Sequence, residues 1–198
     1  MTVESRTPEI VIRVPGGVDA DPAARDAATR ADVVHQAYAS LSDFDGLTDV
    51  LVMATPVSVT AALLRTHAAR LRRIPLVMDI GSVKAGVLDI VPEEGISRVF
   101  VGAHPVCGIE RSGFDASRAE RFDGAPVWLV ADDDAPLQAA EQFWRMIGAA
   151  AIRRIYPPAH DMLVGAASHM RSSLQVSSAE PSPSSVFPVN VSGLAAAT

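Results

Sequence analysis

Short apolar runs alternate with longer alanine-rich stretches along most of the chain. The runs are rich in Val, Ile and Leu without regular polar alternation, which is typical of strands buried on both faces. They predict strands at 9–14, 49–55, 74–81, 97–104, 126–132 and 150–156. The alanine-rich stretches predict helices at 21–31, 56–73, 135–148 and 158–170. Asp21 is suited to cap the first helix, and Pro22 to its first position.

Polar residues collect where the predicted strands end. Apolar strands that are each followed by a helix predict an α/β fold, doubly wound around a mostly parallel sheet. Ligands of such folds bind at the carboxyl ends of the strands. Four polar clusters follow predicted strands, namely Asp19, Thr55 with Pro56, residues 79–82, and His104. We therefore expect a binding site along one edge of the sheet.

The character of the sequence changes after Ser172. The last stretch is rich in Ser and Pro and shows no helical period. Such composition is typical of segments that do not form a packed core. We expect one α/β domain over residues 1–172 and an irregular or disordered tail over 173–198.

Composition limits the partners and the compartment. Asp and Glu outnumber Lys and Arg by 23 to 17, giving a net charge of -6, which argues against nucleic acid as the main partner. The single cysteine excludes an internal disulfide framework and fits a reducing compartment. No apolar run approaches the roughly 20 residues needed to span a bilayer, and residues 1–10 contain no apolar signal region. We expect a cytoplasmic protein without a membrane partner.

Asp19 follows a short predicted strand in the segment GVDADP. In dinucleotide-binding folds an acidic residue at the end of the second strand accepts hydrogen bonds from the ribose hydroxyls, which favours NAD over NADP. Taken alone, the segment is better explained as a plain turn at a helix start, and only the residues that follow favour the ribose-binding interpretation. The glycine-rich G-x-G-x-x-G turn that cradles the phosphates is absent, because no helix follows Gly16 and Gly17 before Asp19.

Two further strand ends carry candidate binding residues. Ala54, Thr55 and Pro56 are small enough to let the backbone approach a ribose or a pyrophosphate, or they simply begin a helix. Asp79, Gly81 and Ser82, with Lys84 shortly after them, predict a polar pocket floor. Ser82 is placed to donate to an imidazole or a nicotinamide amide, and N-capping by the same hydroxyl is compatible with that role.

His104 is the candidate base. It lies between Ala103 and Pro105, at the end of a buried strand and near the loop that holds Ser82. An imidazole has an ordinary pKa of about 6.5, which suits a base that works near neutrality. A lone histidine is more often structural than catalytic, so its position at the sheet edge decides the interpretation. Cys107 and the histidines show no metal-ligand spacing.

Together these residues resemble the prephenate/arogenate dehydrogenase family of tyrosine biosynthesis. The matching segments, over about 17–170, are GVDADP, ATPV, DIGSVK, GAHPVCGIERSG and HDMLVGAASHM. The resemblance implies a Rossmann-like fold and NAD-dependent oxidative decarboxylation of prephenate or arogenate, with NADP the less favoured cofactor. A hydride leaves the ring carbon that bears the 4-hydroxyl, the ring carboxylate departs as carbon dioxide, and the ring becomes aromatic.

The resemblance also assigns roles to residues. His104 matches the catalytic histidine that takes the proton of the 4-hydroxyl, and Ser82 matches the serine that orients it. Glu110, Arg111 and His169 match substrate-binding positions. Asp19 matches the ribose-binding acid, and the remaining cofactor-binding positions are Ala54, Thr55, Pro56, Asp79 and Gly81.

Three departures from the family pattern accompany the resemblance. The glycine-rich first βα turn is missing, so the first βα unit is incomplete. Arg171 and Ser172 stand where the family has proline and a second histidine. The all-helical domain that forms the family's homodimer is replaced by the tail. The alternatives are therefore an NAD-dependent dehydrogenase, a catalytically inactive truncated remnant or binding-only half nucleotide fold, and a related hydroxyacid dehydrogenase, a class that generally has lysine in place of His104.

Overall fold

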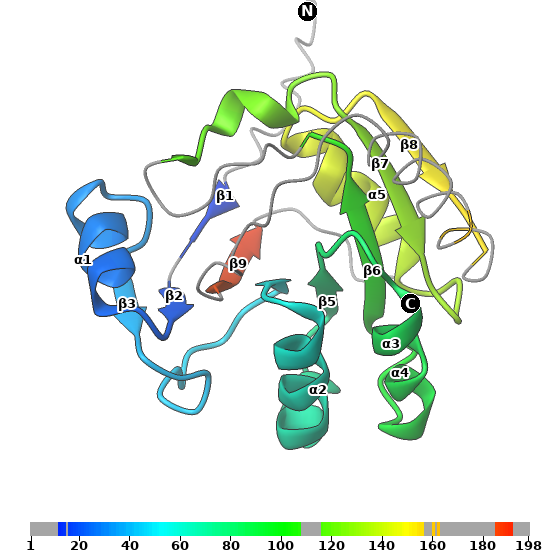
Figure 1. Ribbon diagram of the computed structural model, residues 1–198, viewed down its shortest axis with the longest axis horizontal. Coiled ribbons are helices and arrows are strands. Elements are labelled where there is room, and N and C mark those ends of the chain that lie inside the picture. The colour runs from blue at the N-terminus through cyan, green and yellow to red at the C-terminus, as the bar shows by residue number, and fades with distance from the viewer. Residues whose placement is uncertain are drawn as a thin grey trace, which may run out of the picture.

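A computed structural model describes residues 12–14, 16–107, 116–156, 160, 162 and 185–191. Its centre is one sheet of nine strands in the order β3-β2-β9-β4-β5-β6-β7-β8, with β1 paired to β9 (Figure 1). The strands are β1 (Ile12–Arg13), β2 (Gly16–Asp19), β3 (Gln36–Tyr38), β4 (Val50–Ala54), β5 (Leu76–Asp79), β6 (Phe100–Pro105), β7 (Pro126–Val130), β8 (Ala151–Arg154) and β9 (Ser185–Val191).

The sheet is mostly parallel, as the sequence predicts. Strands β1 to β6 run in one direction, and β7, β8 and β9 run in the other. The reversal after β6 was not predicted, because apolar strands look alike in sequence whichever way they pair. Strand β3 was also missed, since its three residues are only partly buried and carry no apolar run.

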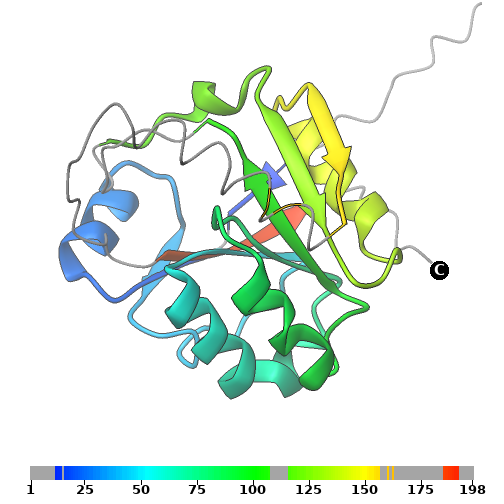
Figure 2. The same ribbon diagram turned by 45° about the vertical axis from the view of Figure 1, so that its right-hand side comes forward.

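Helices cover both faces of the sheet. They are α1 (Pro22–Arg30), α2 (Val57–Leu71), α3 (Ala85–Leu88), α4 (Ile90–Glu93) and α5 (Leu137–Met146), with a 3₁₀ helix at Ala119–Phe122. Helices α2, α3 and α4 lie on one face and α5 on the other (Figure 2). Helix α1 begins as predicted, with Asp21 at the N-cap accepting from the Ala23 N–H and Pro22 in the first turn.

Successive side chains of each central strand point to opposite faces of the sheet, so the hydrophobic core has two parts, one on each face. Leu51, Met53 and Phe100 face the α2 side, where they meet Leu64 and Leu71 of α2. Their neighbours in sequence face α5. The buried hydrophobic residues on that face include Val50, Val52, Met78 and Val101 of the strands, and Phe143 and Trp144 of α5. Each fully buried Leu or Phe contributes about 1.5–3 kcal/mol of burial free energy, so the central strands are fixed from both faces.

The C-terminal tail differs from its prediction in one segment. Residues 185–191, expected to be irregular, form β9 between β2 and β4. Its valines and phenylalanine favour a strand, but Pro188 and the Ser- and Pro-rich surroundings hid this signal, and its two partners are far away in the sequence. The predicted helix at 158–170 lies outside the described residues except for 160 and 162, which are helical. Within the described part of the chain, no helix has the length and apolar character that crossing a membrane requires.

Candidate active site at the carboxyl edge of the sheet

The polar clusters meet along one edge, as the strand pattern predicts. Strands β2, β4, β5 and β6 all end there, because they run in the same direction. Asp19 and Ala54 lie in one row, on either side of Ser185 of β9. Asp79 of β5 lies opposite Met53 and Gly102, and His104 is two residues further along β6. Asp19 and His104 are four strand spacings apart, which is roughly 19 Å.

Asp79 and Lys84 form a buried ion pair beneath this edge. Lys84 Nζ lies 2.6 Å from Asp79 Oδ2, and the two side chains are 0% and 2% exposed. The same Oδ2 accepts from the Gly81 N–H at 3.1 Å. Burial raises the pKa of Asp79 above its ordinary value, and Lys84 opposes this rise by its charge and its hydrogen bond. The carboxylate predicted to bind cofactor is therefore held by its own loop.

Gly102 makes room for this pair. A Cβ at Gly102 would lie 2.8 Å from Lys84 Cδ and 3.3 Å from Asp79 Oδ1. Because real Cβ atoms essentially never come that close, the lysine stem needs a glycine at this position of β6. The Asp79 Oδ1 atom is buried and has no hydrogen-bond partner among the described residues. Such an atom is costly, so the pair is sensitive to any change around it.

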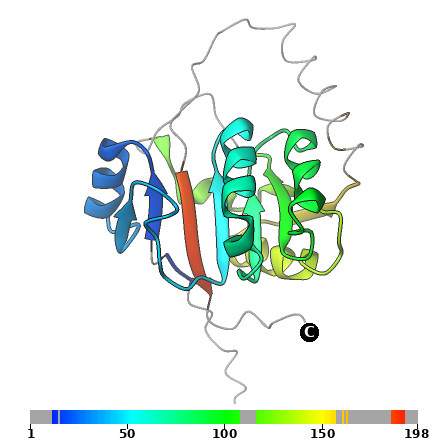
Figure 3. The ribbon, with the colours of Figure 1, turned by 90° about the horizontal axis from the view of Figure 1, so that it is seen from below.

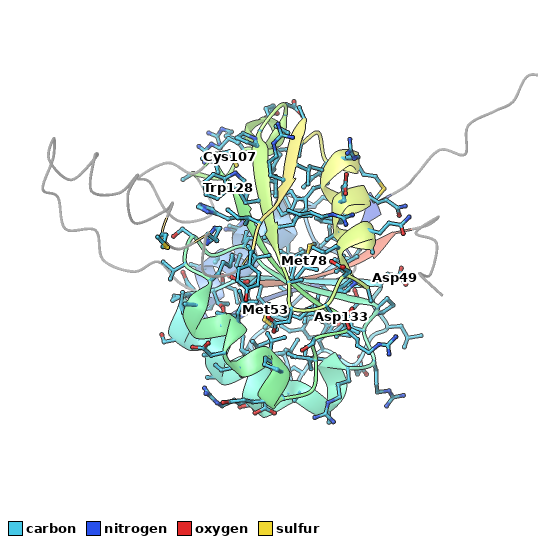
Figure 4. The ribbon with its side chains drawn as sticks, turned by 90° about the vertical axis from the view of Figure 1, so that its right-hand side faces the viewer. Asp49, Met53, Met78, Cys107, Trp128 and Asp133 are labelled. Carbon is cyan, nitrogen blue, oxygen red and sulfur yellow. The ribbon has the colours of Figure 1, made fainter. Side chains whose placement is uncertain are left out.

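His104 is half-buried and contacts a second histidine. Its Nδ1 lies 3.1 Å from Nε2 of His160, whose side chain is fully buried. Trp128, opposite His104 on β7, meets both imidazoles edge to face, with ring centroids 5.8 Å and 5.5 Å away. Figure 4 labels Trp128 and Cys107 at this end of the β6–β7 pair. The three rings therefore pack against one another.

The other predicted site residues occupy varied environments. Ser82 is exposed, and among the described residues it makes no hydrogen bond to His104. Thr55 is buried, with its hydroxyl 2.5 Å from that of Thr60, and Pro56 forms the N-cap of α2. Asp19 is 8% exposed, and its Oδ1 accepts from the Asp21 N–H at 2.8 Å. The predicted substrate-binding residues Glu110, Arg111 and His169 lie outside the described residues.

Sequence reasoning missed three contributors to the site. It considered His160 only as a metal ligand, placed Lys84 in a pocket floor rather than in a buried pair, and gave Trp128 no role. The segment HDMLVG, which begins with His160, was among those that resemble the family, and this resemblance was an available indication. Its contact with His104 spans 56 residues and could not be derived from spacing.

One cavity that is lined by described residues lies elsewhere. It has a volume of about 540 Å³ and is lined by residues 45–48 together with residues from the end of α2 and the loop that follows it. These segments precede β4 and β5, so the cavity is at the amino-terminal edge of the sheet. Its position argues against a part in the chemistry of the histidine pair.

The sheet order, the helices on both faces and the polar carboxyl edge define a nucleotide-binding α/β domain of the Rossmann type. A family model described as "Prephenate dehydrogenase, nucleotide-binding domain" matches residues 10–153. The chain therefore belongs to the prephenate dehydrogenase family, as its motifs indicate.

Known proteins agree with this membership over part of their length. The chain is 30% identical over 125 residues to a cyclohexadienyl dehydrogenase of Zymomonas mobilis, covering 62% of this chain and 42% of that protein. It is 31% identical over 123 residues to a prephenate dehydrogenase of Bacillus subtilis, covering 60% of this chain and 33% of that protein. The crystal structure of prephenate dehydrogenase from Aquifex aeolicus superposes with a TM-score of 0.71 at 25% identity, covering 80% of this chain and 58% of that one. The chain thus spans less than half of either curated relative.

Proposed function

We propose that this chain takes part in the NAD-dependent oxidative decarboxylation of prephenate or arogenate, with His104 as the residue that accepts the proton of the substrate's 4-hydroxyl. The observation that carries the proposal is the imidazole of His104 at the carboxyl edge, paired with His160. Membership of the prephenate dehydrogenase family supports the reaction class. A related Aquifex aeolicus enzyme has a structure in complex with hydroxyphenyl propionate and NAD+.

His160 decides which nitrogen of His104 does the chemistry. At 3.1 Å one of the two facing nitrogens donates and the other accepts. In the productive arrangement, His104 Nδ1–H donates to His160 Nε2, so His104 Nε2 takes the proton from the 4-hydroxyl. The resulting imidazolium keeps its Nδ1–H bond to a neutral acceptor, which stabilises the added charge. His160 is therefore a positioning residue, and His104 the catalytic one.

The cofactor fits the edge only in part. NAD, when bound, supplies the acceptor for the hydride. Asp19, the last residue of β2, is the proposed ribose-binding acid, because such an acid stands at the end of the second strand in dinucleotide-binding folds. The position of the pyrophosphate does not fit, because a phosphate-binding turn requires a first strand that leads into a helix at this edge, and β9 runs the opposite way in that position. We therefore expect weak binding of NAD, and Ser82, Ala54, Thr55, Pro56 and Gly81 remain proposed contacts.

Calorimetric titration with NAD, with and without prephenate, tests the proposal when it is combined with a turnover assay. Wild type should bind NAD and form NADH with prephenate. His104→Asn should keep the NAD affinity and lose turnover by roughly 10²–10⁴-fold, the usual contribution of general acid–base catalysis. Absence of NAD binding by the wild type, or equal turnover by His104→Asn, would refute the proposed function.

The role of His160 has its own readout. His160→Gln keeps an acceptor for the His104 Nδ1–H, whereas His160→Phe keeps only the ring. We expect the acidic limb of the kcat/KM pH profile to shift in the Phe variant and to be largely restored in the Gln variant. A purely structural role would lower the melting temperature in both and leave the pH profile of the remaining activity in place.

One observation favours a second candidate, a family member that does not turn over substrate. The pyrophosphate position is held by β9, which removes the strongest contact that this class of fold makes with a dinucleotide. Such a chain would fail both arms of the titration while folding normally.

A further inference from the structure

Strand β9 stands where a nucleotide-binding fold has its first strand. The standard Rossmann order is 3-2-1-4-5-6. In this chain the order is β3-β2-β9-β4-β5-β6, so a segment from the C-terminal part of the sequence fills the place of strand 1 (Figure 3). It runs antiparallel to both neighbours, whereas a first strand would be parallel to them. The strand order therefore matches the standard Rossmann sheet, but β9 runs in the direction opposite to a first strand.

The pairing of β9 with β4 is continuous. All five residues of β4 have partners in β9, from Val50 opposite Val189 to Ala54 opposite Ser185. Residues 50–53 of β4 are at most 9% exposed, so a partner on this side is needed to satisfy buried backbone groups. On the other side, β9 pairs with β2 near its start and with β1 near its end.

The proline in β9 lies where the sheet tolerates it. On the β1–β2 side, Ile12 is paired with Val191 and Val18 with Val186. The first residues of these pairs are six positions apart and their partners five, so the register shifts by one residue within this interval. This interval contains the break between β1 and β2. Pro188, which has no N–H to donate, falls within it, and among the described residues it is paired with neither β1 nor β2.

The reversed direction has a consequence at the edge. A parallel first strand would leave the sheet between Asp19 and Ala54 and continue into a phosphate-binding turn. Because β9 is antiparallel, its first residue, Ser185, is at that point instead. Ser185 therefore lies at the carboxyl edge, which is the side on which dinucleotides bind. A strand in this orientation and a pyrophosphate therefore compete for the same place.

We propose that residues 185–191 serve as the chain's own substitute for a first strand, joining β1–β3 and α1 to the β4–β8 part of the sheet and closing the pyrophosphate position. That β9 joins the two parts of the sheet is independent of the proposed function. That it closes the pyrophosphate position rests on the proposed function, since this claim concerns NAD. We assign β9 to the same chain as its partners, and the test below also detects a strand supplied by a second copy.

A reversible cross-link tests both halves in the full-length chain. Cys107 is the only cysteine, so Cys107→Ser provides a clean background. Val52 lies directly opposite Phe187, at a separation suited to a disulfide. In the background variant, Val52→Cys with Phe187→Cys should form an intramolecular disulfide on oxidation. The control is Val52→Cys with Val186→Cys. Position 186 is paired with Met53, and successive positions of a strand alternate between the two faces of a sheet, so this pair should not cross-link.

The NAD affinities of the oxidised and reduced forms then test whether β9 closes the pyrophosphate position. The oxidised form should bind NAD at least tenfold more weakly than the reduced form and should melt at a higher temperature. A complementary variant, Val186→Pro, removes an N–H at a position paired on both sides and should lower the melting temperature while strengthening NAD binding. Ala195→Pro, outside β9, is its matched control.

Each outcome decides the proposal. No cross-link at 52/187, cross-linking at 52/186, or disulfides only between molecules would overturn the assignment of β9 to its own chain and register. A cross-link with equal NAD affinity in both redox states would overturn closure. A cross-link with no NAD binding in either state would refute the proposed cofactor, and with it closure, while the strand assignment would stand.

Discussion

Replacing Lys84 by methionine should destabilise the protein far more than its location in a short loop suggests. Methionine keeps the length and the apolar stem of the side chain, so no large cavity forms and packing changes little. What changes is the charge balance. Lys84 Nζ lies 2.6 Å from Asp79 Oδ2, with both side chains out of solvent. At an effective dielectric constant of about 20, the Coulomb attraction at this distance is about 6 kcal/mol.

This attraction adds little to the net stability of the fold, because both ions lose several kcal/mol of hydration free energy on burial. Removing one partner is different, since the other charge remains buried without compensation. We therefore expect Lys84→Met to lower the free energy of unfolding by about 3–5 kcal/mol at neutral pH. Burial already raises the pKa of Asp79, and loss of Lys84 raises it further. A raised folded-state pKa means that the folded state binds the extra proton, so the deficit should shrink as the pH falls through that raised pKa.

Urea unfolding of wild type, Lys84→Met and the double variant Asp79→Asn with Lys84→Met measures these free energies. The double variant removes the stranded charge, and its amide oxygen can still accept from the Gly81 N–H, so most of the loss should be recovered. A loss below about 1 kcal/mol in Lys84→Met, or a double variant that is no more stable than the single one, would refute the reasoning.

Three further predictions concern single features of the fold. Gly102→Ala should lower the free energy of unfolding in urea by about 1–3 kcal/mol, because the new methyl group meets the Lys84 stem. Gly86→Ala is the control and should lower it hardly at all, since its Cβ would have its nearest neighbour at 3.6 Å. Equal effects of the two substitutions would contradict the packing argument. Glu141→Gln should cost less than about 1 kcal/mol at pH 7, since this carboxylate pairs with two exposed arginines. Hydrogen bonds from those arginines lower the pKa of Glu141, so the difference should vanish as the pH falls through that lowered pKa, and a difference that grows in acid would count against the pairing. Asp21→Ala should cost about 1 kcal/mol by loss of the N-cap of α1, with Asp21→Asn as the control that keeps it.

Much of the fold follows from local sequence. Apolar runs of strand length and alanine-rich stretches of helix length located most central elements, since both periodicities are properties of short segments. The end of each parallel strand is likewise local, so the shared edge of Asp19, Asp79 and His104 was predictable once the sheet was taken as mostly parallel. The family resemblance came from the same segments and was confirmed.

The site itself was predicted less completely. The position of His104 was foreseen, and its partner was not. Ser82 was expected to orient the imidazole, and that role stays a prediction. The structure adds a contact between His104 and His160 that was not foreseen. Lys84 looked like a pocket residue because nothing in the segment DIGSVK reveals that Gly102 of a neighbouring strand leaves room to bury it.

The sequence by itself determined most of the central strands and helices, where those strands end and which polar residues stand there, because these depend on neighbours within a few positions. Tertiary structure alone decided that His160 meets His104, that Asp79 and Lys84 are sealed from water, and that residues 185–191 fill the place of a first strand. Each of these is a contact between segments distant in sequence. Its free energy depends on which surfaces the packed sheet brings together, and no local pattern encodes that.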